Sequence, residues 1–374
     1  MPPAKAIIPS CALRDAVPRR CASPAGVGHT FFAYPRKTRS IFVLSIVTLQ
    51  RPKTRESNRG YRFLLVERQR LALKITASGK QEFSIWRSMK TTRIKRPEWI
   101  DVSDDIIIEG DALSALRRLP EKHVQCIVTS PPYWGLRDYN TPEQIGLEPT
   151  LPQFINRLVE IFREARRVLR DDGVLWLNIG DGYTSGNRGW RAPDKKNPAR
   201  AMSVRPDTPE GLKPKDLMGI PWRLAFALQD DGWYLRSDII WNKPNAMPES
   251  VKDRPTRAHE YLFLFSKEEQ YFYDRDAVRE LNGRNCRSVW NVNTQPFAGA
   301  HFATFPAKLI EPCIRSSTRP RDFVLDPFFG SGTVGLSAQQ LDRRYVGIEL
   351  HPDYVAIAAE RLQTEKRNIV RVAA

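Results

Sequence analysis

Two short apolar runs that end in distinctive turns constrain the fold of this chain more than any other feature. The run at 124–129 leads into Ser-Pro-Pro-Tyr at 130–133, and the run at 323–325 leads into Asp-Pro-Phe-Phe-Gly-Ser-Gly-Thr at 326–333. Short apolar runs bounded by proline and glycine are typical of buried strands. Both turns are therefore predicted to follow the carboxyl ends of strands, where open α/β sheets bind their ligands.

Strand-like and helix-like patterns alternate along most of the chain. Strands are expected at 106–111, 124–129, 173–179, 234–241, 260–265, 323–325 and 345–349. Helices are expected at 113–119, 153–169, 221–228, 306–314, 333–341 and 354–362. Such alternation predicts an α/β fold in which helices cover both faces of a doubly wound, mostly parallel sheet.

The glycine-rich turn has the features of a nucleotide-type binding loop. Gly330 and Gly332 let the backbone approach a ligand closely, and Glu349 ends the next predicted strand, 19 residues after Gly330. An acid about 20 residues along such a fold binds ribose hydroxyls. The third glycine of the dinucleotide pattern is absent, which favours S-adenosylmethionine, a cofactor without pyrophosphate, over NAD. A tight turn that binds no ligand is the alternative for the glycine pair alone.

The turn at 130–133 has the groups needed to methylate an amine. An exocyclic amine on a base ring is a poor nucleophile because its lone pair is delocalised. The Ser130 hydroxyl and the Pro131 carbonyl can accept hydrogen bonds from the amino protons and favour a pyramidal nitrogen. Pro132 stiffens the turn, and Tyr133 can stack on a base flipped out of a duplex. Taken alone, the same four residues also suit an ordinary rigid turn.

These motifs and their order resemble the beta-group DNA amino-methyltransferases, which act on N4 of cytosine or N6 of adenine. In that family the catalytic motif precedes the cofactor loop, whereas most methyltransferases carry the loop first. Further matches are Gly-Asp-Ala-Leu at 110–113, Phe-Pro-Ala-Lys-Leu at 305–309 and Tyr-Val-Gly-Ile-Glu at 345–349. The resemblance covers about 89–374.

The resemblance implies a Rossmann-like, S-adenosylmethionine-dependent methyltransferase fold with a small recognition insertion. It places Asp326 at the methionine end of the cofactor and Asp111 near its adenine. The expected cofactor-binding residues are Asp111, Phe305, Asp326, Phe328, Gly330, Gly332, Thr333 and Glu349, and the expected catalytic residues are Ser130, Pro131, Pro132 and Tyr133. Serine at 130 is common in the N4-cytosine enzymes, so N4 of cytosine in double-stranded DNA is the expected target and N6 of adenine is the alternative.

Other chemistries fit the sequence less well. Cytosine C5 methylation uses a Pro-Cys nucleophile, but Pro312-Cys313 falls inside a predicted helix, where a core thiol is the simpler role. Protein-glutamine and RNA methyltransferases with similar motifs carry the cofactor loop first. A catalytically silent nucleic-acid-binding protein is the alternative from another class, and intact catalytic and cofactor motifs argue against it.

Charge divides the chain into two regions. Residues 1–88 contain 17 Lys and Arg against 4 Asp and Glu, whereas 89–374 contain 42 against 38. The first region shows no sustained hydrophobic period. It is either an extension upstream of a biological start at Met89 or a basic arm that holds DNA phosphates. The methyltransferase domain is expected at 89–374, with candidate DNA-recognition segments at 183–215 and 271–304.

The remaining expectations concern partners and location. The five cysteines form no Cys-x-x-Cys pair, so neither a metal site nor a disulfide framework is expected. The longest early apolar run is far shorter than the ~20 residues of a membrane span. We therefore expect a cytoplasmic protein that binds DNA and S-adenosylmethionine, with a cognate restriction endonuclease as a candidate partner.

Overall fold

The computed structural model describes three strands before residue 99 and most of the chain after it. The later described ranges are 99–139, 141–185, 206–280, 282–295, 305–363 and 368–372. The chain forms two compact units, Met1–Lys95 and Arg96–Ala374.

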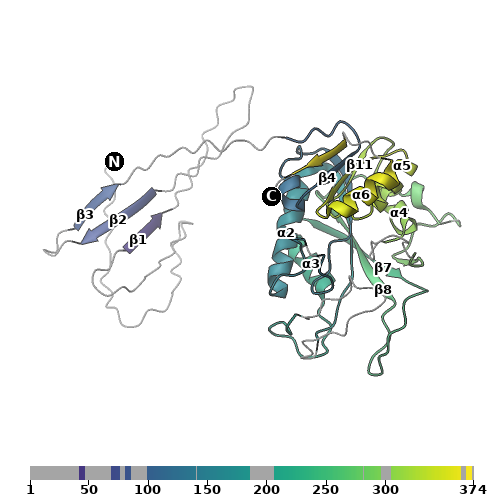
Figure 1. Cartoon of the computed structure of the whole chain (residues 1–374), viewed down its shortest axis with the longest axis horizontal. Helices are drawn as coiled ribbons and strands as arrows, with labels where there is room; N and C mark the ends of the chain where they lie inside the picture. The colour runs from purple at the N-terminus through teal and green to yellow at the C-terminus, as the bar shows by residue number, and fades with distance from the viewer. Residues whose placement is uncertain are drawn as a thin grey trace. The chain divides into compact units, whose positions relative to one another are not determined.

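The first unit contains a small antiparallel sheet (Figure 1). Its strands are β1 (Phe42–Ile46), β2 (Gln69–Ile75) and β3 (Gln81–Ile85), with β2 in the middle. Our sequence analysis assigned no element to this region, so these strands are additions to it. Both interpretations of 1–88, the upstream extension and the basic arm, stay predictions.

The described residues of the second unit are built on one sheet of nine strands. The strands are β4 (Ile106–Glu109), β5 (Val124–Thr129), β6 (Leu169–Ile179), β7 (Tyr234–Asn242), β8 (His259–Ser266), β9 (Val289–Asn291), β10 (Phe323–Asp326), β11 (Arg344–Glu349) and β12 (Ile369–Arg371). Their order is β12-β4-β11-β10-β5-β6-β8-β7-β9. All neighbours are parallel except β6 with β8 and β7 with β8. The prediction of a mostly parallel sheet is confirmed.

Helices cover both faces of this sheet, as the alternating pattern predicted. They are α1 (Ala112–Leu116), α2 (Leu151–Val168), α3 (Ile220–Asp230), α4 (Ala307–Ser317), α5 (Thr333–Gln340) and α6 (Pro352–Leu362). The buried side chains form two clusters, one with α1, α2 and α3 and one with α4, α5 and α6. Successive residues of β5 divide between them: Ile127 joins the first cluster, and Cys126 and Val128 join the second. This division is the doubly wound arrangement.

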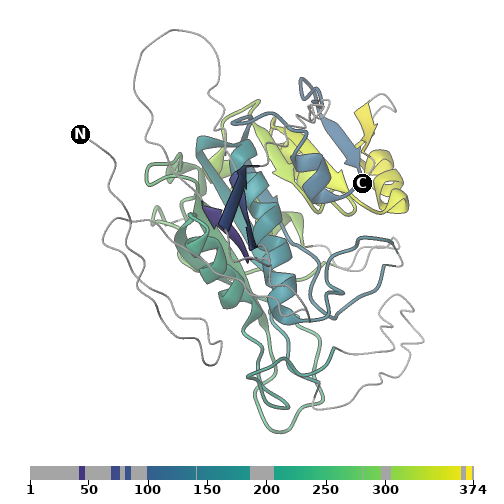
Figure 2. The ribbon, with the colours of Figure 1, turned by 90° about the vertical axis from the view of Figure 1, so that its left-hand side faces the viewer.

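Local sequence explains where individual elements begin and how the sheet ends. Helix α2 starts at a capping box in which Thr150 and Gln153 satisfy each other's backbone N–H groups. Strand β12, which our sequence analysis missed, pairs in parallel with β4, and Figure 2 shows the yellow β12 beside the blue β4. Strand β9 was also missed, and it lies inside the candidate recognition segment 271–304.

The order of strands creates a crevice at the carboxyl ends of β5 and β10. These two strands are neighbours, but the helix after β5 covers one face of the sheet and the helix after β10 covers the other. Loops that diverge in this way leave a ligand-binding crevice. One hydrogen bond joins the two loops at this point: Thr129 Oγ1 donates to Asp326 Oδ1 over 2.6 Å.

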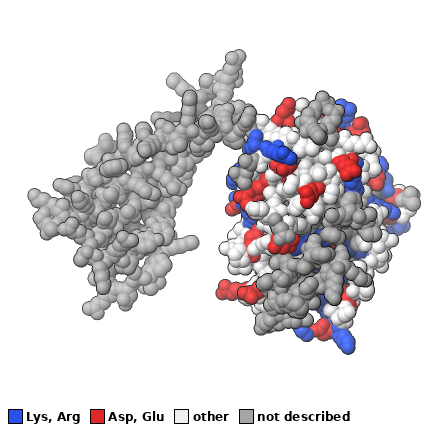
Figure 3. Space-filling view, viewed as in Figure 1, with Lys and Arg blue, Asp and Glu red and all other residues white. Residues whose placement is uncertain are grey.

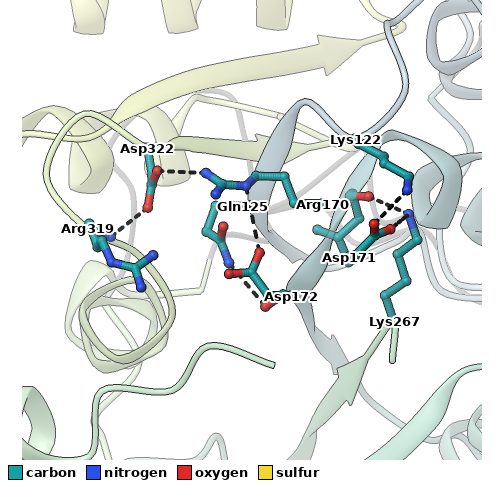
Figure 4. Close-up of polar contacts among 9 residues, drawn as sticks. Lys122, Gln125, Arg170, Asp171, Asp172, Lys267, Arg319 and Asp322 are labelled. Atoms are coloured by element: carbon teal, nitrogen blue, oxygen red, sulfur yellow. Dashed lines mark hydrogen bonds and ion pairs between the residues drawn. The ribbon is translucent and has the colours of Figure 1, made fainter. Parts of the chain in front are cut away.

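The amino ends of the same strands carry a network of ion pairs (Figure 4). Lys122 Nζ lies 2.6 Å from Asp171 Oδ2, and Lys267 Nζ lies 3.2 Å from Asp171 Oδ1. Arg170 reaches Asp322 over 3.3 Å. The side chains of Lys122 and Asp171 are more than half exposed, at 58% and 55%. An exposed pair such as Lys122 with Asp171 contributes little to stability, whereas Lys267 and Asp322 are largely buried.

Candidate active site

A cavity of about 710 Å³ lies at the carboxyl ends of the parallel strands. It receives residues from the loops after β4, β5, β10 and β11, which meet at this edge because these strands run in the same direction. The predicted site residues that line it are Asp111, Ser130, Pro131, Pro132, Tyr133, Phe305, Phe328, Gly330 and Glu349. Three others, Asp326, Gly332 and Thr333, do not line it.

Glu349 is fixed at the end of β11 by the backbone around it. Its Oε2 accepts a hydrogen bond from Gly330 N over 2.7 Å, and its Oε1 accepts one from His351 N over 2.8 Å. Burial raises the pKa of this carboxyl, and the backbone hydrogen bonds oppose the rise. A carboxylate has about four acceptor positions, so Glu349 keeps acceptor capacity toward the cavity.

Asp111 is the N-cap of α1 and lies at the cavity wall. Its Oδ2 accepts a hydrogen bond from Ser114 N over 2.9 Å, and its Oδ1 lies 3.5 Å from an Arg157 nitrogen. The side chain is only 5% exposed. The cap fixes the carboxylate at the helix N-terminus, so its position is set before any ligand arrives.

The two glycines of the cofactor loop have different roles. Gly330 lines the cavity at φ +51°, where a side chain is disfavoured. A Cβ on Gly332 would instead lie 3.1 Å from Leu362 and 3.2 Å from Ala358, both on α6. Our expectation that Gly332 keeps a path open for the ligand therefore does not fit the structure. This glycine is required by its φ of +78° and by close packing against α6.

Asp326 lies beneath the loop rather than in the cavity. Its Oδ1 accepts hydrogen bonds from Thr129 Oγ1 and from Phe328 N, and the residue is 2% exposed. Burial raises the pKa of this carboxyl to about 7, against the opposing effect of both hydrogen bonds. The geometry makes Asp326 the residue that joins the catalytic turn to the cofactor loop.

Thr333 and the two phenylalanines complete the predicted set. Thr333 begins α5, and its Oγ1 accepts a hydrogen bond from Arg361 over 3.1 Å. Phe305 precedes α4 and is 9% exposed at the wall. Phe328 packs edge-on against Phe162 of α2, with ring centroids 6.5 Å apart. The aromatic rings give the cavity apolar walls, which suits ligand sites in general.

The catalytic turn continues directly from β5 into the cavity. Tyr133 donates a hydrogen bond from its hydroxyl to Glu260 Oε2 over 2.9 Å. Burial raises the pKa of Tyr133 well above its ordinary value, and the Glu260 charge adds to the rise. The tyrosine is therefore a neutral donor with a fixed hydroxyl, and Ser130 and Pro131 line the cavity beside it.

Among the polar residues of this cavity that sequence analysis missed, three carry the argument below. Asn178 is the last residue but one of β6, Lys243 follows β7 and Glu260 is the second residue of β8. We interpreted Glu260 only as part of a strand start. It reaches the cavity because β8 runs antiparallel to its neighbours, so its amino end lies where the others have their carboxyl ends. An alternating strand pattern does not reveal direction, so it could not place Glu260 in the cavity. The signal for Glu260 was that the stretch at 254–260 resembles one that recurs in the family, and the signal for Asn178 and Lys243 was their position at the ends of predicted strands.

The rival chemistries receive no geometric support from the described residues. Cys313 is fully buried in α4, where its Sγ contacts Leu309 O over 3.6 Å and burial raises its pKa well above the ordinary value. It lies outside the cavity lining. No group of acidic, His or Cys side chains in the described ranges could hold a metal ion. Within the same ranges, no helix has the length and apolar character to cross a membrane.

The candidate recognition segments are only partly described. In 183–215, residues 186–205 lie outside the described residues; Tyr183 is contacted by Arg254, whose guanidinium carbon lies 3.9 Å from the ring centroid. In 271–304, residues 281 and 296–304 lie outside them as well. Thr294 N donates to Asn245 Oδ1 over 2.8 Å, and both residues line the cavity. One part of this segment therefore borders the site.

The donor and acceptor pattern of the cavity fits S-adenosylmethionine. Ribose hydroxyls are donors that match the open acceptor positions of Glu349, and the adenine amino group is a donor that matches Asp111. Gly330 lets backbone and ligand approach each other. Phe305 and Phe328 supply apolar surface for the uncharged parts.

Comparison with solved structures identifies the fold. The PvuII DNA methyltransferase (cytosine-N4-specific) has the same fold, with a TM-score of 0.55 and 22% identity over 71% of this chain and 92% of that one. A putative DNA modification methylase from Thermus thermophilus, in complex with S-adenosylmethionine, gives a TM-score of 0.52 and 24% identity over 72% of this chain and 99% of that one. The fold is that of the S-adenosylmethionine-dependent DNA methyltransferases, as predicted.

Sequence comparison then gives the family. The N6/N4 DNA methylase family model matches residues 124–360, more than half of the chain. The Type II methyltransferase M.Cfr9I of Citrobacter freundii is 70% identical over 76% of this chain and 97% of its own length. M.XycI of Xanthomonas campestris pv. cyanopsidis, also a Type II methyltransferase, is 72% identical over 75% of this chain and 95% of its own. The chain belongs to the N6/N4 family of DNA methyltransferases, whose methyl donor is S-adenosylmethionine.

Proposed function

We propose that this enzyme transfers a methyl group to N4 of cytosine in double-stranded DNA, at a base flipped into the cavity described above. The observation that carries the choice of base is Ser130, which lines the cavity directly after β5. A serine hydroxyl is short and neutral, and it accepts a hydrogen bond from an amino proton without adding charge beside the base. The target base itself is the part of the proposal that goes beyond family membership.

Each part of the site has a defined task in this reaction. S-adenosylmethionine, when bound, supplies an electrophilic methyl group on a sulfonium centre. Glu349 would hold its ribose hydroxyls, and Asp111 would accept from its adenine amino group. Ser130 Oγ and the Pro131 carbonyl draw the amino protons of the base away from the ring plane, which restores the lone pair for in-line attack. The proton that the nitrogen loses passes to solvent, and no covalent intermediate forms.

Tyr133 and the apolar walls hold the base during transfer. The tyrosine ring offers a face on which a flipped base can stack, and its hydroxyl is fixed by Glu260. Closure of the cavity around the base would strengthen these hydrogen bonds because water is removed. Positioning of this kind can supply several orders of magnitude in rate.

The alternative within the family is N6 of adenine. The two reactions share the cofactor, the in-line geometry and the need for acceptors at the amine. Mass spectrometry of nucleosides from DNA of cells that express the chain decides between them, with N4-methylcytosine as the expected product. DNA that contains N6-methyladenine and no N4-methylcytosine would overturn the choice of base and leave the family unchanged.

DNA binding outside the cavity is proposed for the segments 183–215 and 271–304. On the face in Figure 3, basic and acidic side chains of the described residues are interspersed, and no broad region of one sign covers it. The largest excess of basic residues is in the sequence 1–88. A basic arm there would add phosphate contacts, which raise affinity for every sequence equally.

A truncated chain of residues 89–374 tests the alternatives for that region. If Met89 is the biological start, the truncated enzyme keeps its rate and sequence preference. If 1–88 are a basic arm, truncation weakens DNA binding across sequences and reduces its dependence on salt. Titration of both chains against one duplex at several salt concentrations distinguishes the two.

A cognate endonuclease and a cytoplasmic location are further proposals. The endonuclease is consistent with the Type II names of the relatives.

A further inference from the structure

A partly buried ion pair lines the cavity, and its lysine has no task in the mechanism above. Lys243 Nζ donates to Glu260 Oε1, and both side chains are less than one fifth exposed, at 17% and 18%. The register of β7 and β8 pairs Trp241 with Glu260 and Asn242 with His259. Lys243 and Glu260 therefore leave their strands at the same edge as the catalytic turn.

The carboxylate of Glu260 is almost fully engaged. Its Oε2 accepts hydrogen bonds from Tyr133 over 2.9 Å and from Asn178 Nδ2 over 3.2 Å, and its Oε1 accepts from Lys243. About four acceptor positions exist on a carboxylate, so one remains. Glu260 therefore orients three donors and has little remaining capacity to bind a ligand itself.

The ammonium group of Lys243 has donors beyond the one that binds Glu260. It carries three N–H donors and no acceptor, and Glu260 engages one of them. Its nitrogen lies 4.1 Å from the centroid of the Trp241 ring, and both residues line the cavity. Burying an ion pair costs desolvation that apolar packing would avoid. An ammonium group with open donors on a cavity wall is a candidate for ligand recognition.

We propose that Lys243, oriented by Glu260, donates to the acceptor edge of the target cytosine, at N3 and O2. This inference rests on the proposed function, because it needs the base to enter this cavity with its amine at Ser130. Beyond its amino group, cytosine presents two acceptors, N3 and O2. Adenine presents one, N1, followed by a C–H group. A cationic donor on this wall therefore favours cytosine, and Glu260 is its positioning residue.

Lys243→Met tests the donor, because methionine keeps most of the side-chain length and removes every N–H. On a duplex with the natural target, the variant is expected to lower kcat/KM roughly 10- to 100-fold, as loss of a hydrogen bond to a charged group does. S-adenosylmethionine affinity should not change, and the melting temperature should fall because Glu260 loses its cationic partner. Lys122→Met is the matched control, since Lys122 also pairs with a carboxylate but lies at the other edge of the sheet.

Duplexes with a base analogue identify the contact. Two duplexes are compared, in which the target cytosine lacks either N3 or O2. On at least one of them the kcat/KM of the wild-type enzyme should fall by a factor similar to that caused by Lys243→Met. The variant itself should methylate that analogue no more slowly than it methylates natural cytosine. Lys243→Gln, which keeps two neutral donors, should retain part of the rate and provides a second variant if methionine impairs folding. The loss caused by Glu260→Gln should be smaller in the Lys243→Met background than in the wild type, because the part that acts through Lys243 is already gone and the parts that act through Tyr133 and Asn178 remain.

The outcomes separate this inference from the proposed function. The inference is supported if the loss caused by Lys243→Met disappears on one analogue while the wild-type enzyme makes N4-methylcytosine. The inference is overturned if, on both analogues, the loss caused by Lys243→Met multiplies the loss caused by the analogue, or if Lys243→Met has an unchanged rate. The proposed function stands in either case. A wild-type enzyme that makes no N4-methylcytosine overturns both.

Discussion

The two ends of the parallel strands carry the same kinds of acidic side chain in opposite environments. At the amino end, hydrogen bonds from Lys122 and then Lys267 lower the pKa of the exposed Asp171. At the carboxyl end, burial raises the pKa of Glu349, and it raises that of Asp326 to about 7. The partners there are backbone N–H groups and one hydroxyl instead of cations.

The difference teaches how to separate a working carboxylate from a structural one in this fold. The paired, solvated Asp171 at the amino end has its charge cancelled locally and gains little from it. At the carboxyl end, Asp111 and Glu260 pair with Arg157 and Lys243, but Glu349 is buried with backbone N–H groups as its partners. Glu349 is therefore poised for a ligand that brings donors, which is what a cofactor with ribose hydroxyls offers. Variants at the two ends can test this contrast.

Ser130→Ala should have the largest effect, because it removes an acceptor at the reacting amine. Turnover should fall roughly 100-fold, comparable to the loss of one oriented polar group in other active sites, while S-adenosylmethionine affinity stays the same. Single-turnover methylation and calorimetry measure the two quantities. Ser103→Ala, which removes a hydroxyl bonded to exposed Asp101, is the control. Equal losses in both variants would contradict a catalytic role.

Glu349→Gln should come next, with an effect on cofactor affinity. The two carboxylate oxygens each accept one backbone N–H, and a glutamine can accept only one of them while its amide N–H₂ opposes the other. Affinity for S-adenosylmethionine should fall roughly 10- to 100-fold by calorimetry.

The matched variant at the amino end is Asp322→Asn. Asp322 also accepts hydrogen bonds with both oxygens, one from Arg170 and one from Arg319 N. Its substitution should leave cofactor affinity unchanged. A loss of S-adenosylmethionine affinity in both Glu349→Gln and Asp322→Asn would show that carboxylates at the two ends of the strands do not differ in their effect on cofactor binding.

Asp326→Asn should change how stability depends on pH. A carboxyl whose pKa rises from 3.8 to about 7 on folding stabilises the fold fully below the lower value, and that stability is lost as the pH rises through about 7. This pKa difference corresponds to a change of at most about 4 kcal/mol in the free energy of unfolding. Asparagine keeps both hydrogen bonds because Thr129 and Phe328 bind the same oxygen.

When neither protein has a ligand bound, Asp326→Asn should therefore be more stable than the wild type at pH 8. Its unfolding free energy should also vary less between about pH 4 and 7. Urea titrations across this range measure both effects. Parallel curves for the two proteins would show that Asp326 is not the titrating group.

Asp171→Asn should have the smallest effect and the opposite sign with pH. Its lowered pKa means that any stability it adds is present above the unfolded value near 3.8 and is lost as the pH falls. Because the pair is exposed, the melting temperature at neutral pH should hardly change, and methylation should not change at all. Loss of activity in this variant would break the distinction between the two edges.

The sequence by itself determined the parts of the protein that depend on local pattern. Alternating apolar runs located most strands and helices of the second unit to within a few residues, because burial of one face imposes a period of two or 3.6. The turns at 130–133 and 326–333 could be assigned to strand ends for the same reason. Family membership followed from these motifs, since their residue types carry the chemistry.

Only the tertiary structure decided which side chains share the cavity. Glu260 enters it because β8 runs antiparallel to β6 and β7, and Lys243 enters it because β7 runs in the same direction as β6. Strand direction is set by connections across the whole sheet rather than by the residues of the strand. Burial of Asp326 beneath the loop and packing of Gly332 against α6 likewise depend on segments far away in sequence. Local pattern fixes which residues face inward, but contacts over long sequence separations fix what they meet there.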